Sequence, residues 1–174
     1  MIDWISPQPT GIYLPTANCW IDPSQAVEKA LVTHGHADHA RGGHGTVWAT
    51  AETQAIMALR YGEAQVNVPM AYGEAVEVGG GITASWHPAG HVLGSAQILL
   101  ERGGERVVVT GDYKRRPDPT CAPFEPVKCD VLVTEATFGL PIFVHPPIAG
   151  EMAKVIDALE LYPERCVLIG AYAL

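Results

Sequence analysis

A cluster of three histidines and one carboxylate within six residues constrains this chain more than any other feature. It follows an apolar run of strand character and reads Leu31-Val32-Thr33-His34-Gly35-His36-Ala37-Asp38-His39. His34 and His36, two apart on extended backbone, can point to one side, and Gly35 lets the chain bend around an ion. Asp38 and His39 can then face a neighbouring point. Burying such polar side chains without a metal or partner would cost several kcal/mol, so the pattern predicts a metal centre.

Two further segments supply candidate ligands at predicted strand ends. His91 lies in the glycine-bracketed turn 88–94, and Asp112 lies at the exit of an apolar strand that reads Val107-Val108-Val109-Thr110-Gly111. Loops at strand ends commonly display functional groups, and an aspartate there can bridge two ions through its two oxygens. We therefore expect two divalent ions about 3.5 to 4 Å apart. Zinc is the metal that suits these ligands best, with manganese or iron as alternatives.

Strand-like and helix-like segments alternate along the chain, which predicts the α/β class. The glycine pair 103–104 predicts a tight hairpin. The segment 116–126 holds four of the fourteen prolines and predicts an ordered surface loop. Predicted helices cover residues 51–61, capped by Thr50, and 149–161. Predicted strands cover residues 12–14, 19–22, 30–33, 47–50, 82–87, 95–100, 105–111, 131–135 and 166–170.

Length and charge narrow the class of protein. A chain of 174 residues fits one domain, 1–174, with no second domain. No apolar run reaches the roughly 18 residues of a membrane span, and the N-terminus lacks a signal-peptide start, so we expect a cytoplasmic protein. Nineteen acidic against eleven basic residues give a net charge of −8, which argues against a general electrostatic grip on nucleic acid. Lys114, Arg115 and Arg116 are a candidate local phosphate contact, with a solvated surface as the equal alternative.

In order and spacing, the HxHxDH pattern, the turn at His91 and the sequence Thr110-Gly111-Asp112 resemble the metallo-β-lactamase superfamily. The segments 111–116 and 134–139 resemble its β-CASP-like, nucleic-acid-processing branch, and within it the bacterial ligase-associated DNA exonucleases. The resemblance implies an αββα sandwich. It further implies that this chain is the N-terminal portion of that domain, without the closing half and the β-CASP insert.

The resemblance also implies the ligand sets. One metal would be bound by the three histidines of the two turns and the second by the end of the HxHxDH pattern, with one aspartate shared. The first set is His34, His36 and His91, the second is Asp38 and His39, and the shared ligand is Asp112. The family's last histidine for the second metal lies further downstream than residue 174.

Three other residues match the family's pattern outside the ligands. Asp22 corresponds to an aspartate that orients the site, although a turn-forming role before Pro23 is an equal alternative. Glu135 corresponds to an acidic residue just after a core strand, and we expect it to act in catalysis. His145 corresponds to the histidine that follows it, and we expect it to contact substrate.

The expected function is metal-dependent hydrolysis of phosphodiesters by a DNA exonuclease acting in repair through a two-metal-activated water. Asp38 is the best local candidate to orient that water. One alternative is a small-molecule hydrolase of the same superfamily, a thioesterase or lactonase, and another is an inactive fragment. DNA is favoured over RNA by the resemblance alone. The resemblance also implies an ATP-dependent DNA ligase and a helicase as partners.

Overall fold

The computed structural model describes residues 2–170 of the chain. These residues form two compact units, one ending at Glu135 and the other beginning at Ala136. The assignment of the whole chain to one domain stays a prediction. In chain order the elements are β1 (Ser6–Gln8), β2 (Gly11–Leu14), β3 (Cys19–Ile21), β4 (Lys29–Leu31), β5 (Thr46–Thr50), α1 (Ala51–Tyr61), β6 (Val66–Met70), β7 (Ala75–Gly79), β8 (Ile82–Pro88), β9 (Ala96–Arg102), β10 (Glu105–Val109), β11 (Val131–Val133) and α2 (Ile148–Leu161).

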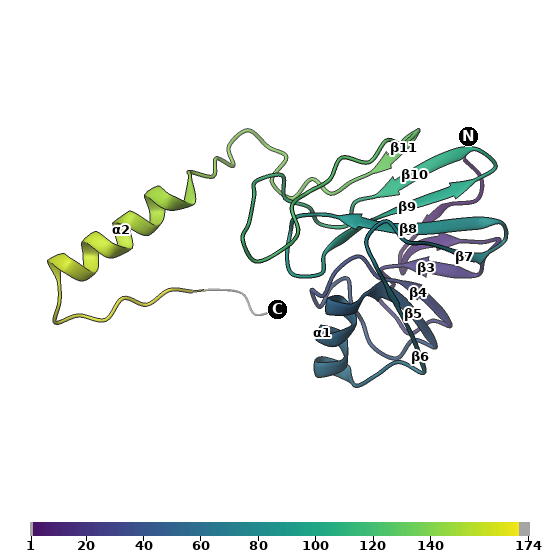
Figure 1. Ribbon diagram of the computed structural model, residues 1–174, viewed down its shortest axis with the longest axis horizontal. Helices are drawn as coiled ribbons and strands as arrows, with labels where there is room; N and C mark the ends of the chain where they lie inside the picture. The colour runs from purple at the N-terminus through teal and green to yellow at the C-terminus, as the bar shows by residue number, and fades with distance from the viewer. Residues whose placement is uncertain (1, 171–174) are drawn as a thin grey trace. The chain divides into compact units, whose positions relative to one another are not determined.

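The first unit is built on two β-sheets, which confirms the predicted α/β class with paired sheets (Figure 1). The first sheet has the order β1-β2-β3-β4-β5-β6, and the second has the order β11-β10-β9-β8-β7. Strands β3 to β6 run parallel to one another. In the second sheet β9 is antiparallel to both β8 and β10, and β11 is parallel to β10. The predicted glycine hairpin is confirmed, because Arg102 pairs with Glu105 across it.

The main apolar core lies between the two sheets. Side chains alternate between the two faces of a strand, and each sheet turns its apolar face toward the other sheet. On β9, Ile98 and Leu100 belong to this core, whereas Gln97 lies on the opposite face. There the Gln97 amide donates to the carbonyl of Glu125 at 2.7 Å, in the proline-rich segment predicted to be a loop. The segment 116–126 has no helix or strand, as predicted.

Helix α1 covers the outer face of the first sheet. Its Met57 packs in a second apolar cluster with Val47 and Ala49 of β5. The predicted cap is confirmed, since the Thr50 hydroxyl accepts the backbone N–H of Thr53 at 3.3 Å. The helix therefore begins directly at the end of β5.

Three strands, β1, β6 and β7, were not predicted from the sequence. One predicted strand, at residues 166–170, is wrong. All three missed strands lie at sheet edges, where one side has no neighbour and the apolar signal is weak. Residues 166–170 form no strand, and Leu168 is 94% exposed there. A short apolar run satisfies a strand pattern, but it becomes a strand only when another strand pairs with it.

The second unit contains helix α2. The predicted helix is confirmed, beginning one residue earlier than expected, at Ile148. Its apolar positions Met152, Ile156 and Leu159 are 47%, 54% and 48% exposed. Within the described residues, neither α1 nor α2 combines the length and the apolar character needed to cross a lipid bilayer.

Candidate metal centre

The predicted site residues follow the carboxyl ends of strands from both sheets. Strands β8, β10 and β11 run in one direction, so the segments carrying His91, Asp112 and Glu135 leave the second sheet at the same end. Asp22 follows β3 and His34 follows β4, which are parallel neighbours in the first sheet. The two edges are joined where the Ala96 N–H donates to the carbonyl of Thr33 at 2.8 Å.

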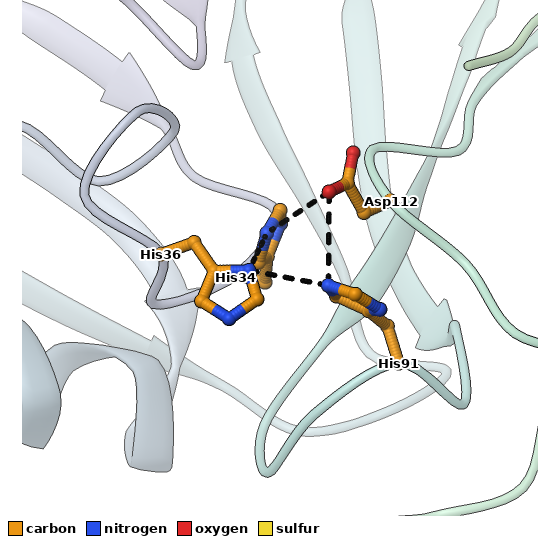
Figure 2. A group of neighbouring side chains, drawn as sticks. All are labelled: His34, His36, His91 and Asp112. Atoms are coloured by element: carbon orange, nitrogen blue, oxygen red, sulfur yellow. Dashed lines mark hydrogen bonds and ion pairs between the residues drawn. The ribbon is translucent and has the colours of Figure 1, made fainter. Parts of the chain in front are cut away.

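Four of the predicted ligands point toward one another (Figure 2). Nitrogen atoms of three histidines and one carboxylate oxygen lie within 4.8 Å of one another, from His34, His36, His91 and Asp112. His36 Nδ1 lies 3.1 Å from His34 Nε2 and 3.1 Å from His91 Nε2. Asp112 Oδ2 lies 3.6 Å from His91 Nε2 and 3.9 Å from His34 Nε2. We call these four residues the histidine cluster.

The other predicted ligands lie near the second oxygen of Asp112. Its second oxygen, Oδ1, lies 3.4 Å from His39 Nε2. The same His39 nitrogen lies 3.8 Å from Asp38 Oδ2, and the Asp38 side chain is 77% exposed. One carboxylate thus has one oxygen near the histidine cluster and the other oxygen near the Asp38–His39 pair.

Asp22 contacts the residues next to the histidine cluster and the Asp38–His39 pair. Its backbone has a φ of 46°, a left-handed conformation that aspartate tolerates in turns, so the turn-forming alternative describes its backbone. Its side chain also accepts hydrogen bonds, from Thr33 N–H at 2.8 Å and from His39 Nδ1 at 2.8 Å. The carboxylate therefore contacts the segment that carries the ligands without facing the cluster itself.

The electrostatics of the histidine cluster favour a bound cation. Burial first, and then the positive charge of His39, lowers the pKa of His34 to about 3, and burial lowers the pKa of His91. A hydrogen bond from His39 lowers the pKa of Asp112 to about 2. Burial opposes protonation of His39, but Asp112 and Asp22 together outweigh it and raise its pKa to about 10.

The residues present fit a metal ion. Neutral imidazoles at His34 and His91 offer lone pairs, and the ionised Asp112 offers negative charge, which is the state of these groups when they coordinate a cation. Three imidazole nitrogens and one carboxylate oxygen are donors that zinc accepts. The cluster that the sequence predicted as a metal site therefore has suitable donors at suitable separations.

Two glycines permit the close approach of the loops that carry the ligands. Gly90 has a φ of 69°, and a Cβ there would lie 2.4 Å from the carbonyl oxygen of Lys114. Gly111 has a φ of 54°, and a Cβ there would lie 2.6 Å from the hydroxyl of Thr33. Any side chain at either position would push apart the segments that hold His91 and Asp112.

The predicted substrate contacts lie in different surroundings. Lys114 Nζ donates a hydrogen bond to the carboxylate of Asp118, so its charge is balanced locally. Arg115 and Arg116 are exposed. His145 lies in the second unit, where its ring centroid is 4.8 Å from that of Phe138. Substrate binding by these residues stays a prediction.

Glu135 borders an open cleft beside the centre. The cleft has a volume of about 270 Å³, and its lining includes Asp38, His39, Asp112 and Thr134 as well as Glu135. The negative charge of Glu135 also acts on His91, where it opposes the lowering of the histidine pKa by burial. The cleft provides room for a substrate group next to the two oxygens of Asp112.

Several residues that hold the ligand loops were missed by the sequence analysis. The Ser95 hydroxyl accepts the backbone N–H of His91 at 3.0 Å and so holds that turn closed. Arg60 of α1 donates to the carbonyl of Gly35 at 2.9 Å. A hydroxyl residue close to a ligand in sequence, as Ser95 is, could have been noticed. Arg60 gives no such signal, because it lies 25 residues from its partner.

Two curated proteins show similarity to most of the chain. It is 33% identical over 140 residues to a probable DNA ligase from Opitutus terrae, which covers 80% of this chain and 14% of the relative. It is 32% identical over 149 residues to the endoribonuclease YSH1 of Mycosarcoma maydis, which covers 65% of this chain and 17% of the relative. The chain therefore spans only a small part of these curated relatives. No protein-family model matches it.

A solved structure supports the fold alone. The crystal structure of a protein of unknown function from Enterococcus faecalis V583 superposes with a TM-score of 0.52 at 14% identity, covering 82% of this chain and 40% of that one. The sequence relatives carry the assignment further, because they include β-CASP proteins of one superfamily. With its two sheets and its histidine cluster, this chain belongs to the metallo-β-lactamase superfamily, in the β-CASP-like branch.

Proposed function

We propose that this chain forms the catalytic metal centre of a nuclease that hydrolyses DNA from an end during repair. The observation that carries the proposal is the position of Asp112, whose Oδ2 faces His91 at 3.6 Å and whose Oδ1 faces His39 at 3.4 Å. A carboxylate whose two oxygens face separate donor groups is suited to bridge two divalent cations. The relatives named as an endoribonuclease and a probable DNA ligase support nucleic acid as the substrate class.

The roles of the residues follow from this assignment. We assign one zinc ion to the histidine cluster and a second to the Asp38–His39 pair, with Asp112 shared. Bound metal would activate water and stabilise negative charge at phosphorus. Asp38, an exposed carboxylate beside His39, is assigned to orient the water, and Glu135 to act on the substrate in the cleft. Asp22 is assigned to orient His39, which leaves the Nε2 of that ring directed at Asp112.

The substrate is assigned as DNA, with RNA as a second candidate. The likeness of 80% of this chain to part of a probable DNA ligase supports DNA and supports work beside an ATP-dependent DNA ligase, with a helicase as a further partner. The likeness to an endoribonuclease favours RNA. Because no RNA-reading module is visible in the sequence, the two candidates require separate assays.

The three bases after Asp112 give a testable prediction about binding. In a Lys114→Gln, Arg115→Gln, Arg116→Gln variant, we expect the logarithm of the DNA-binding constant to fall less steeply with the logarithm of salt concentration. On single-stranded DNA the slope should decrease by about 0.7 for each phosphate that the variant no longer neutralises. Lys114 should contribute less than the exposed Arg115, because Asp118 already balances the Lys114 charge. Fluorescence anisotropy with labelled single-stranded DNA measures the slope.

Arg102→Gln is the matched control, because Arg102 ends β9 at the opposite end of the sheet from Asp112. Its slope should equal that of the unaltered protein. An unaltered slope in the triple variant would mean that the three bases are only a solvated surface.

The proposal is tested by metal content and nuclease activity measured together. We expect elemental analysis of the purified chain to find two divalent ions. We expect end-labelled single-stranded DNA to release nucleotides in a reaction that a chelator stops. Release from RNA alone would replace the DNA assignment by the second candidate, and turnover only of a thioester or lactone would assign a small-molecule hydrolase. A chain with no bound metal and no activity on any of these substrates would contradict the proposal.

A further inference from the structure

We infer that Thr33 is a positioning residue that links Asp22 to the histidine cluster through a chain of hydrogen bonds. This inference rests on the proposed metal centre and names a further residue on which that centre depends. Thr33 does not face the cluster, and its side chain is buried among Asp22, His34 and Gly111. It is the residue immediately before the HxHxDH pattern, two residues after the end of β4.

The direction of each hydrogen bond follows from the donors available. The Thr33 hydroxyl lies 2.6 Å from Asp22 Oδ2, and a carboxylate accepts hydrogen bonds, so the hydroxyl hydrogen belongs to this contact. The same hydroxyl oxygen lies 3.0 Å from His34 Nδ1. Having donated its only hydrogen to Asp22, Thr33 accepts from His34, and His34 therefore carries its hydrogen on Nδ1.

This arrangement sets the tautomer of His34. With the hydrogen on Nδ1, the lone pair lies on Nε2, the atom that stands 3.1 Å from His36 Nδ1 in the histidine cluster. His34 is fully buried, so no solvent can replace the Thr33 hydroxyl as the partner of Nδ1. A ligand imidazole held at its second nitrogen is oriented and made more basic, which strengthens its metal bond.

Asp22 thereby acts on both groups of ligands. Directly, it accepts from His39 Nδ1 at 2.8 Å, next to the Asp38–His39 pair. Through Thr33, it acts on His34 in the histidine cluster. Thr33 also fills the space that a side chain at Gly111 would need, one residue before Asp112. The buried Thr33 hydroxyl thus contacts Asp22, His34 and the backbone at Gly111, which leads into the shared ligand Asp112.

The test compares Thr33→Val, which keeps the shape and removes the hydroxyl, with Thr33→Ser, which keeps the hydroxyl. The measurement is the affinity for Zn²⁺ in competition with a chromophoric chelator, using the whole 174-residue chain. We expect Thr33→Val to bind its tightest zinc ion about 10- to 100-fold more weakly, and Thr33→Ser to remain within about threefold of the unaltered protein. Thr83→Val is the control. Thr83 lies near the start of β8, whose other end leads into the turn with His91, so this variant should leave the zinc affinity unchanged.

Two further measurements separate the possible outcomes. The unfolding midpoint without zinc should be similar in Thr33→Val and Thr33→Ser, so that weaker binding is not a loss of fold. His34→Ala should bind zinc far more weakly than any Thr33 variant. If Thr33→Val binds within about threefold of normal while His34→Ala fails, the link through Thr33 is overturned and the metal centre stands. If His34→Ala binds normally, the metal centre itself is wrong.

The tautomer of His34 in the zinc-loaded, unaltered protein provides a test that needs no variant to fold. Nitrogen-15 NMR of the imidazole should show the hydrogen on Nδ1, protected from exchange with solvent. A His34 ring without a hydrogen on Nδ1 would overturn the inference, whatever the variants do.

Discussion

Replacing Asp112 with alanine is expected to reduce nuclease activity by at least about a thousandfold and to lower the number of bound metal ions. The physical reason is that each oxygen of this carboxylate serves a different group of ligands, Oδ2 the histidine cluster and Oδ1 the Asp38–His39 pair. No other described carboxylate stands between the two. Nucleotide release from end-labelled DNA and elemental analysis, made on the same preparation, measure the two effects.

Two further variants make this result specific. Asp112→Asn keeps the shape and one oxygen but removes the charge, so we expect it to retain more metal than the alanine variant and little more activity. Asp130→Ala is the matched control at the opposite end of the strands, where its carboxylate only accepts the N–H of Arg106 at 2.9 Å. An alanine variant at Asp112 with its full metal content and its full rate would show that the shared-ligand assignment is wrong.

Replacing Trp86 with alanine is expected to cause the largest loss of stability, about 3 to 5 kcal/mol in the free energy of unfolding. Trp86 is fully buried in the core between the sheets and is one of its largest side chains. Its indole N–H also donates to the carbonyl of Val32 at 3.1 Å, two residues before His34. Removing the ring therefore opens a cavity and leaves that carbonyl without its partner, which costs about a further 1 kcal/mol or more.

Urea unfolding of the zinc-free protein measures this effect. Trp86→Phe keeps most of the apolar volume and removes the N–H, so we expect a smaller loss than for alanine. Trp20→Ala is the comparison at a half-buried tryptophan, which stacks on Tyr13 with ring centroids 4.4 Å apart. If Trp20→Ala destabilised the protein more than Trp86→Ala, the core would not be centred where the two sheets meet.

The interior strands and the helices could be predicted from sequence, but of the four edge strands only β11 could. Helix α1 carries a cap at Thr50, helix α2 carries apolar residues at helical spacing, and both signals are local. The edge strand β6 contains Pro69, which argues against a central strand, and its register on β5 depends on a partner that is distant in sequence. The run at 166–170 shows the converse case, because an apolar pattern alone does not supply a pairing strand.

The candidate site divides in the same way. His34, His36, Asp38 and His39 could be predicted as candidate ligands because four donors within six residues are a local property of the chain. That His91 joins them depends on the order β10-β9-β8, which brings its turn to the same end of the second sheet as Asp112. Sequence spacing of 55 residues between His36 and His91 says nothing about the 3.1 Å between their nitrogens.

The local sequence was therefore enough to predict a metal site, since the kinds of donor and their spacing along one loop are encoded within a few residues. The packing of the two sheets decided which atom faces which, because Asp112 reaches the histidines only where the segments after β4 and β10 meet, as Thr33 and Gly111 do. It also decided the role of Thr33, whose contacts with Asp22 and Gly111 join segments 11 and 78 residues away. The contact with Asp22 follows from the pairing of β3 with β4, and the contact with Gly111 follows from the packing of one sheet on the other, which no local pattern encodes.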